Sequence, residues 1–315
     1  MYMSRKINIL ILGADGFLGS NLAESLSKEG KYQIRAFDLF PDGTSRNLDH
    51  LKNKVEIFPG NFLNKNDLKK AVKDMDYVFH FISLTTPGSS MGDPLIDIDT
   101  NIRGTIRLLD ECCKAKVKKF VFPSSGGAIY GNQDKNYLRE NDLINPISPY
   151  AISKLTIEKY LEYYRIHKGL DYLIIRLSNP YGPKQNIIGN QGLIPIFLNL
   201  VKEGKPITIF GDGNNIRDYI YVDDAIKNII KIAFKQTRHR IYNIGSGKGA
   251  TINQVVKLIK KVTGKRVKIN KLSARDSDIR RVALSTKRIR KEINYALDTT
   301  LEEGIRKTWE WVDSI

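Results

Sequence analysis

Cysteine is nearly absent from this chain, which has 315 residues but only two cysteines, Cys112 and Cys113. Because the two are adjacent, they form neither a disulfide framework nor the C-x-x-C spacing of a zinc or redox site. The sequence therefore excludes a small disulfide-stapled protein and gives no pattern of metal ligands. It fits the reducing conditions of the cytoplasm, where we expect the protein to be.

Long hydrophobic runs are also missing. The first apolar run, residues 7–12, stops at Gly13. A membrane-spanning helix needs roughly 20 apolar residues, and the core of a signal peptide is longer as well. We therefore expect no integral membrane association.

Acidic residues are the scarcer charged class, because 34 Asp and Glu stand against 51 Lys and Arg, for a formal net charge of +17. Such a balance favours anionic ligands. The basic residues are scattered, however, and aromatic residues are not interleaved with them as in proteins that bind single-stranded nucleic acid. The charge pattern predicts no nucleic-acid partner.

What the chain does have is an alternation of short apolar runs with longer, helix-like stretches up to about residue 178. This alternation predicts an α/β fold with a doubly wound, Rossmann-like parallel sheet. Loops rich in Gly, Pro and Asn follow, and they predict a smaller α/β substrate-binding domain. We expect the first domain at 1–178, rejoined by about 219–245, and the second at 179–315. The apolar runs are 7–12, 34–37, 55–58, 78–82, 120–122 and 172–177.

A glycine-rich turn follows the first apolar run. Gly13, Gly16 and Gly19 lie between a predicted buried strand and a helix start whose backbone amides can hold a pyrophosphate. Asp38 closes the second strand, where its carboxylate would accept both ribose hydroxyls and repel a 2′-phosphate. The turn therefore predicts a binding site for NAD rather than NADP. Its residues are Gly13, Gly16, Phe17, Leu18, Gly19 and Asp38.

A tyrosine and a lysine form the candidate catalytic pair. Three Tyr-x-x-x-Lys pairs occur, beginning at Tyr2, Tyr150 and Tyr164, but only Tyr150 stands at a predicted helix start beyond the fifth strand. One helical turn places Tyr150 and Lys154 on one face. A free tyrosine titrates near pH ~10, so it needs a fixed ammonium to act as a base at neutral pH. We predict that Tyr150 is the base and that Lys154 stabilises its phenolate and holds the nicotinamide ribose.

The G-x-x-G-x-x-G spacing of the turn and this Tyr-Lys pair resemble the short-chain dehydrogenase/reductase superfamily in its extended branch. The resemblance covers nearly the whole chain, and residues 101–105 resemble the family's Asn-x-x-Gly-Thr helix. It implies that Asn61, where the family has an aspartate, receives the adenine amino group through its amide oxygen. It also implies cofactor contacts by Phe62, His80 and Ile82.

The same resemblance predicts a serine or threonine at the end of the fifth strand. Counting back from Tyr130 places Gly126 there, and counting forward from the strand places Ser125 there. We prefer Ser125, because a glycine has no side chain to hydrogen-bond a sugar hydroxyl. Ser125 would bridge the substrate 4-hydroxyl and Tyr150, whereas Ser124 would be structural and bond the backbone of the loop.

The residues after Ser125 distinguish the reactions of this branch. Gly126, Gly127 and Ala128 have no side chain that carries a proton, whereas the 4,6-dehydratases have an Asp-Glu pair there. The branch's reductases generally use NADPH, which Asp38 disfavours. The interpretation is NAD-dependent epimerisation at C4 of a UDP-hexose or UDP-N-acetylhexosamine through a 4-keto intermediate. The alternatives are a 4,6-dehydratase or 4-reductase acting on a nucleotide sugar, and a non-catalytic dinucleotide-sensing protein.

The resemblance also implies a UDP-sugar substrate, whose diphosphate two arginines can hold by forked bonds. Val282, seven residues after Arg275, would wall the pocket beside the sugar 2-substituent, and a valine leaves room there for an N-acetyl group. A homodimer is expected through helices of about Leu95 to Lys114 and Pro149 to His167. The predicted substrate residues are Ser125, Asn179, Gly192, Leu193, Thr208, Ile209, Phe210, Arg217, Tyr219, Arg275, Asp278 and Val282.

Overall fold

The computed structural model describes residues 5–189, 192–274 and 279–315, and the chain forms two compact units. Unit 1 comprises Met1–Ser124 and Ser148–Ile175, and unit 2 comprises Ser125–Ile147 and Arg176–Ile315. The chain leaves unit 1 after Ser124, returns to it for residues 148–175, and then stays in unit 2. The domain limits expected from the sequence stay a prediction.

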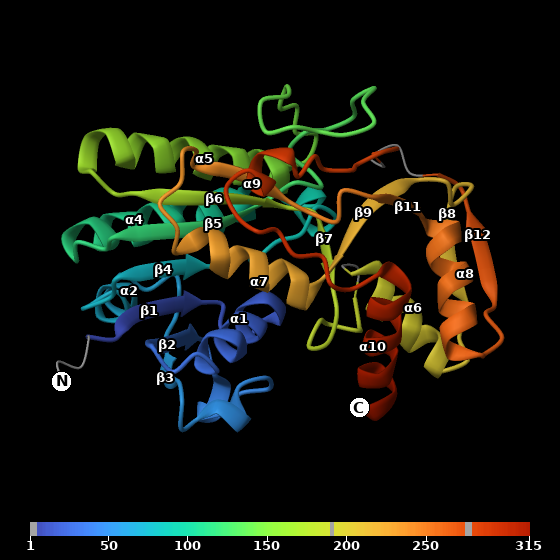
Figure 1. Cartoon of the computed structure of the whole chain (residues 1–315), viewed down its shortest axis with the longest axis horizontal. Coiled ribbons are helices and arrows are strands. Elements are labelled where there is room, and N and C mark those ends of the chain that lie inside the picture. The colour runs from blue at the N-terminus through green and yellow to red at the C-terminus, as the bar shows by residue number, and fades with distance from the viewer. Residues whose placement is uncertain (1–4, 190–191, 275–278) are drawn as a thin grey trace. The chain divides into compact units, whose positions relative to one another are not determined.

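The central sheet has seven strands in the order β10-β6-β5-β4-β1-β2-β3 (Figure 1). The pairs β1·β2, β1·β4, β2·β3 and β4·β5 are parallel. The order reverses between β1 and β4, which is the switch point of a doubly wound sheet. The predicted fold class is confirmed. The strands are β1 (Ile7–Leu12), β2 (Tyr32–Asp38), β3 (Glu56–Pro59), β4 (Tyr77–His80), β5 (Lys119–Ser125), β6 (Tyr172–Leu177) and β10 (Ile241–Ile244).

β1 lies inside the sheet because its sequence can be buried on both faces. Ile9, Leu10, Ile11 and Leu12 are all 0% exposed, as expected for a parallel strand with neighbours on both edges. The glycine turn follows the carboxyl end of β1. Open α/β sheets bind their ligands at this end, beside the switch point.

The helices of unit 1 pack on the sheet and on each other. α1 packs against β1 and β2, and α4 lies beside both α2 and α5 (Figure 1). A π-helical segment, η4 (Asp97–Ile102), leads into α4 and contacts α5 as well. α5 begins where the Oγ of Ser148 accepts the N–H of Ala151 at 3.3 Å. The helices are α1 (Phe17–Ser27), α2 (Lys65–Ala71), α3 (Pro94–Ile96), α4 (Arg103–Lys114) and α5 (Pro149–Lys168).

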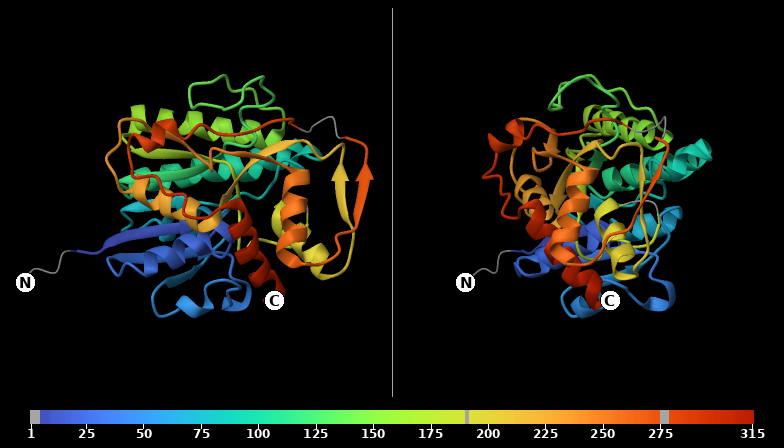
Figure 2. Two further views of the ribbon diagram at one scale, coloured as in Figure 1. Left: turned by 45° about the vertical axis from the view of Figure 1, so that its right-hand side comes forward. Right: turned by 90° about the vertical axis from the view of Figure 1, so that its right-hand side faces the viewer.

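Unit 2 contains two further small sheets, with the orders β11-β9-β7 and β12-β8. α6 packs on β8, and α6, α8 and α10 contact one another (Figure 2). In the described part of the chain, no helix is long and apolar enough to cross a membrane. The remaining elements are β7 (Asn179–Tyr181), β8 (Ile207–Phe210), β9 (Ile216–Tyr221), β11 (Gly249–Thr251), β12 (Ile269–Leu272), α6 (Leu193–Lys202), α7 (Val222–Ala233), α8 (Ile252–Thr263), α9 (Lys287–Arg290) and α10 (Leu301–Ser314).

A buried carboxylate, that of Asp218, ties β9 to distant segments of unit 2. Asp218 is 0% exposed, and its Oδ1 accepts from the N–H and the hydroxyl of Ser246, both at 2.7 Å. Its Oδ2 accepts the N–H groups of Gly247 at 3.2 Å and Leu284 at 3.0 Å. Burial raises the pKa of Asp218, and these donors oppose the rise. The bonds fix the strand that carries Arg217 and Tyr219.

Candidate active site

The glycine turn is closed by contacts between its own atoms. Gly13 has φ +78°, a left-handed conformation that favours glycine. A Cβ on Gly19 would lie 2.1 Å from the carbonyl oxygen of Gly13, so no larger residue fits there. Gly16 is the N-cap of α1, and without a capping side chain the first amides of the helix can bind a phosphate. The shape of the turn therefore fits the pyrophosphate of NAD.

Asp38 ends β2 beside this turn. Its Oδ2 accepts the N–H of Asp15 at 3.0 Å, and its Oδ1 accepts the N–H of Leu39 at 2.8 Å. Burial raises the pKa of Asp38, and the two N–H donors oppose the rise. The carboxylate fixes the turn and keeps lone pairs for ribose hydroxyls.

Asp15 has a role that the sequence reasoning missed. Its carboxylate accepts bonds from Ser45 Oγ at 2.5 Å, Arg46 N at 3.1 Å and Asn47 N at 2.9 Å. These bonds fasten the segment after β2 to the glycine turn. The sequence contained one sign of this role. The negative charge of Asp15 opposes phosphate binding, so an acidic residue inside a pyrophosphate-binding turn indicates a different, structural function.

Asn61 and Phe62 follow β3. The Oδ1 of Asn61 already accepts the N–H of Leu63 at 2.9 Å, so an adenine amino group would use its second lone pair. The rings of Phe62 and His80 lie with their centroids 5.1 Å apart. A Cβ on Gly104 would lie 2.4 Å from Phe62, so the glycine of the predicted Asn-x-x-Gly-Thr helix makes room for this ring.

His80 lies in the core of unit 1, where it is 1% exposed. Its Nε2 lies 2.9 Å from the Oγ1 of Thr105. Burial, more than the charge of Lys154, lowers the pKa of His80 to about 3, so the ring is neutral at physiological pH. The cofactor contact expected for His80 would therefore be made by backbone atoms of β4 or by van der Waals contact. The neighbouring Ile82 places its backbone N 3.0 Å from the position of a Cβ on Gly13.

Tyr150 and Lys154 stand one turn apart at the start of α5. The N–H of Tyr150 donates to Ser90 Oγ at 3.2 Å. Lys154 is only 6% exposed, and its Nζ donates to Pro123 O at 3.3 Å. The same Nζ lies 4.8 Å from the ring centroid of Phe122 and 5.6 Å from that of Tyr150. The structure thus brings the predicted base and its ammonium together.

The end of β5 favours Ser125 over Gly126 as the third group. A Cβ on Gly126 would lie 2.5 Å from Leu284 Cδ1 and 2.9 Å from Arg176 O, so no side chain fits there. Ser125 is the last residue of β5. The expectation that Ser124 bonds the loop backbone is wrong, because its Oγ is buried without a hydrogen-bond partner in the described structure.

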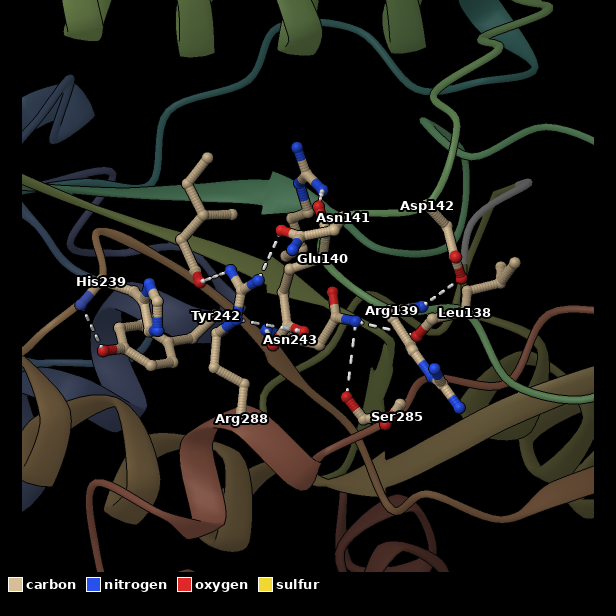
Figure 3. A network of polar contacts seen from close by, with 12 residues as sticks. Leu138, Arg139, Glu140, Asn141, Asp142, His239, Tyr242, Asn243, Ser285 and Arg288 are labelled. Atoms are coloured by element: carbon tan, nitrogen blue, oxygen red, sulfur yellow. Dashed lines mark hydrogen bonds and ion pairs between the residues drawn. The ribbon is translucent and has the colours of Figure 1, made fainter.

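A polar network holds residues 138–142, in the segment that follows Ser125 (Figure 3). Arg288 donates to Asn141 Oδ1 at 2.5 Å and to Ile241 O at 3.1 Å, and its Nε lies 3.6 Å from Glu140 Oε2. Glu140 Oε1 also accepts the N–H of Asn243 at 3.0 Å. The segment is therefore anchored to β10 and α9.

Asn179 and Tyr219 are paired residues of β7 and β9. The Nδ2 of Asn179 donates to Asp218 O at 3.0 Å. The hydroxyl of Tyr219 is buried without a partner in the described structure, and burial raises its pKa to about 12. Buried hydroxyls are usually hydrogen-bonded, so this one fits a ligand acceptor. Arg217, two residues earlier, donates from Nη1 to Ile216 O at 3.0 Å.

The other predicted substrate residues are spread over unit 2. Gly192 has φ +100° and is the N-cap of α6, which Leu193 begins. Residues 208–210 form most of β8. Arg275 and Asp278 lie outside the described residues. The structure therefore shows where these elements lie but gives no contact for the second arginine.

Val282 lies in an apolar cluster of unit 2. It is 1% exposed, and the cluster includes Ile129, Tyr130, Leu138 and Leu284. A larger residue at this position must displace some of these neighbours. Val282 is therefore part of the apolar core of unit 2, and its place beside the sugar 2-substituent stays a prediction.

A turn that fits a pyrophosphate and a Tyr-Lys pair with a buried lysine are together typical of enzymes that move a hydride and a proton at a hydroxyl-bearing carbon. The model of the NAD dependent epimerase/dehydratase family matches residues 9–245, so the chain belongs to this family. It is 34% identical over 306 residues to a putative UDP-glucose 4-epimerase of Methanocaldococcus jannaschii. This alignment covers 96% of this chain and 98% of the relative.

Solved structures agree with this assignment. UDP-glucose 4-epimerase of Thermotoga maritima, determined with UDP-glucose, has a TM-score of 0.91 and 33% identity, over 98% of this chain and 99% of that chain. UDP-N-acetylglucosamine 4-epimerase of Methanobrevibacter ruminantium, in complex with UDP-N-acetylmuramic acid, has a TM-score of 0.89 and 29% identity, over 99% of both chains. The resemblance noted in the sequence and the dependence on NAD are confirmed.

Gly19→Ala is expected to abolish NAD binding, because the new Cβ would collide with the Gly13 carbonyl and open the turn. Gly88→Ala is the matched control, since Gly88 has φ −77° and nothing lies within 4 Å of an added Cβ. Calorimetric titration with NAD measures both variants. Wild-type affinity in Gly19→Ala would show that the turn is not the cofactor site.

Proposed function

We propose that the protein interconverts the C4 epimers of a UDP-hexose or a UDP-N-acetylhexosamine, with NAD as cofactor and a transient 4-keto sugar as intermediate. The observation that carries this proposal is the buried Lys154 ammonium beside the Tyr150 ring. It is supported by the family match and by the relatives that act at C4 of UDP-sugars.

Tyr150 takes the proton of the substrate 4-hydroxyl and returns a proton to the 4-keto oxygen. This requires a phenolate, which a nearby ammonium stabilises. Burial lowers the pKa of Lys154 to about 8, with Asp97 opposing the change, so most of the ammonium persists at pH 7. When bound, NAD supplies the acceptor and later the donor of the hydride at C4. Ser125 hydrogen-bonds the 4-hydroxyl in this proposal.

Residues of unit 2 bind the nucleotide in this proposal. Arg217 and Tyr219, whose hydroxyl has no partner among the described residues, are donors on β9 that suit phosphate or ribose oxygens. Arg275 and Asp278 are assigned only through their match to the family pattern. The diphosphate would then be held by arginine, whose planar fork matches phosphate oxygens.

A dehydratase is the second candidate, since the family includes dehydratases. That reaction needs another side chain to move a second proton, and Gly126, Gly127 and Ala128 supply none. The contacts around Gly126 also exclude a side chain there. NMR of products from UDP-glucose, UDP-galactose and their N-acetyl counterparts decides between the two. C4 epimers are expected, whereas a 4-keto-6-deoxy sugar would indicate a dehydratase.

A homodimer formed through residues 95–114 and 149–167 is part of the proposal. α5 exposes the large side chains Ile152, Tyr160, Tyr163 and Ile166, which a partner helix can cover. Light scattering measures the molecular mass in solution.

A cytoplasmic location is proposed as well, because both cysteines are free thiols.

Tyr150→Phe is expected to lower kcat by about 10²- to 10⁴-fold, because the base is lost while the ring is kept. Bound NAD should be unchanged. Turnover is measured with the preferred UDP-sugar, and cofactor content by extraction. Near wild-type turnover would overturn the assignment of Tyr150.

Ser125→Ala is expected to lower kcat much more than Ser124→Ala does. The Ser124 hydroxyl is buried and has no hydrogen-bond partner among the described residues, so its removal should be close to neutral for stability. Turnover and the midpoint of thermal unfolding (Tm) of both variants are measured together. The opposite order in kcat would mean that the strand register of the catalytic serine is shifted.

Val282→Tyr is expected to lower kcat/KM for N-acetylated substrates more than for plain ones, because the larger ring removes the space for the acetamido group. Thermal unfolding shows whether the apolar cluster tolerates the ring. If the variant folds and the ratio of the two kcat/KM values is unchanged, the size limit lies at another residue.

A further inference from the structure

A second buried charge lies on η4, outside the Tyr-Lys pair. Asp97 is 1% exposed. Its Oδ1 accepts the hydroxyl of Thr85 at 2.7 Å and the Nδ2 of Asn101 at 2.9 Å. Its Oδ2 is buried and has no hydrogen-bond partner in the described structure. Within the described residues, only one of the two carboxylate oxygens thus accepts hydrogen bonds. An uncompensated charge is strongly disfavoured in a protein interior, so a buried carboxylate in this state requires an explanation.

The groups that hold Asp97 are themselves fixed. Asn101 also donates from Nδ2 to Thr85 Oγ1 at 2.8 Å, and its Oδ1 accepts the N–H of Leu84 at 3.0 Å. Thr85 and Asn101 are each 6% exposed. The carboxylate is therefore locked to the loop after β4 and to a π-helical turn, a geometry that is frequent at functional sites.

α5 packs against η4 and carries the buried Lys154. In the described structure this ammonium has one hydrogen-bond acceptor, Pro123 O, and two aromatic rings, those of Phe122 and Tyr150. Titratable side chains on the elements packed here include Tyr150 and the buried Glu158 on its own helix, His80 on β4 and Asp97 on η4. The His80 ring is neutral, and of the carboxylates it is Asp97 that acts on the charge of Lys154.

We propose that Asp97 is a positioning residue whose buried carboxylate keeps the Lys154 ammonium charged and oriented beside Tyr150. The inference rests on the proposed function, in which Lys154 stabilises the Tyr150 phenolate. Burial lowers the pKa of Lys154 to about 8, and Asp97 opposes that change. Without Asp97 the ammonium would lose its proton at a lower pH.

The first test is the pH profile of kcat in Asp97→Asn, which has the size and most of the hydrogen bonds of the wild type. Activity needs protonated Lys154, so the wild-type profile should fall above about pH 8. In Asp97→Asn the alkaline fall should move down by about 1 pH unit, with a lower kcat and little change in KM. An unmoved alkaline fall would overturn the proposal.

Two controls separate charge from structure. Asp99→Asn removes the same charge from an exposed residue of η4, whose carboxylate pairs with Arg103, and should leave the profile unchanged. Thr85→Val removes the hydrogen bond to Asp97 but keeps the charge, so it should lower Tm without moving the alkaline fall. A shift in Thr85→Val equal to that in Asp97→Asn would make Asp97 a structural residue only.

A second test does not depend on activity, so its failure is distinct from a failure of the proposed function. Tm is measured for Asp97→Asn, Lys154→Met and the double variant at pH 7. If the two charges attract, Asp97→Asn lowers Tm with Lys154 present, and lowers it less or raises it in the Lys154→Met background. Equal changes in both backgrounds would show that the charges do not interact.

Discussion

A positive charge that has to stay buried is the constraint on which the candidate site depends. Lys154 is packed between the ring of Phe122, the carbonyl of Pro123 and the ring of Tyr150. An ammonium in such surroundings tends to lose its proton. The neighbouring His80 is neutral and so adds no repulsion. The ammonium therefore depends on the polar groups packed near it to keep its proton.

The second constraint is that the backbone lies very close to neighbouring atoms at three positions, and each of these positions is a glycine. Gly19 lets α1 start against the Gly13 carbonyl, and Gly126 lets the chain pass between Leu284 and the carbonyls of residues 176 and 177. Gly104 gives space to the ring of Phe62. In each case an added Cβ would come within 3 Å of its neighbours. These positions shape the site by the absence of side chains.

The fold class and the cofactor could both be predicted from the sequence, because each produces a pattern among residues that are close together in the chain. The apolar run of β1 followed by Gly13, Gly16 and Gly19 predicts a strand, a turn and a helix within about twenty residues. The contacts of the buried acids Asp97 and Asp218 could not be predicted, and for Asp15 the sequence offered only its place inside the glycine turn. Asp15 and Asp218 bond to groups about 30 residues away or more, and Asp97 to Thr85, so no local spacing distinguishes them from exposed acids. The role expected for Ser124 was wrong for a similar reason, since packing decides what a buried hydroxyl meets.

The network of Figure 3 also sets an order of events during synthesis. Arg288 and Asn141 are 147 positions apart in the chain, and Asn243 and Glu140 are 103 apart. At ~5–20 residues per second, the ribosome needs about 7 to 30 seconds between Asn141 and Arg288. The strands and glycine turn of unit 1 are complete much earlier. The glycine turn is therefore synthesised first, and the segment after Ser125 gains its anchor on Asn243 103 residues after Glu140 and its anchor on Arg288 147 residues after Asn141.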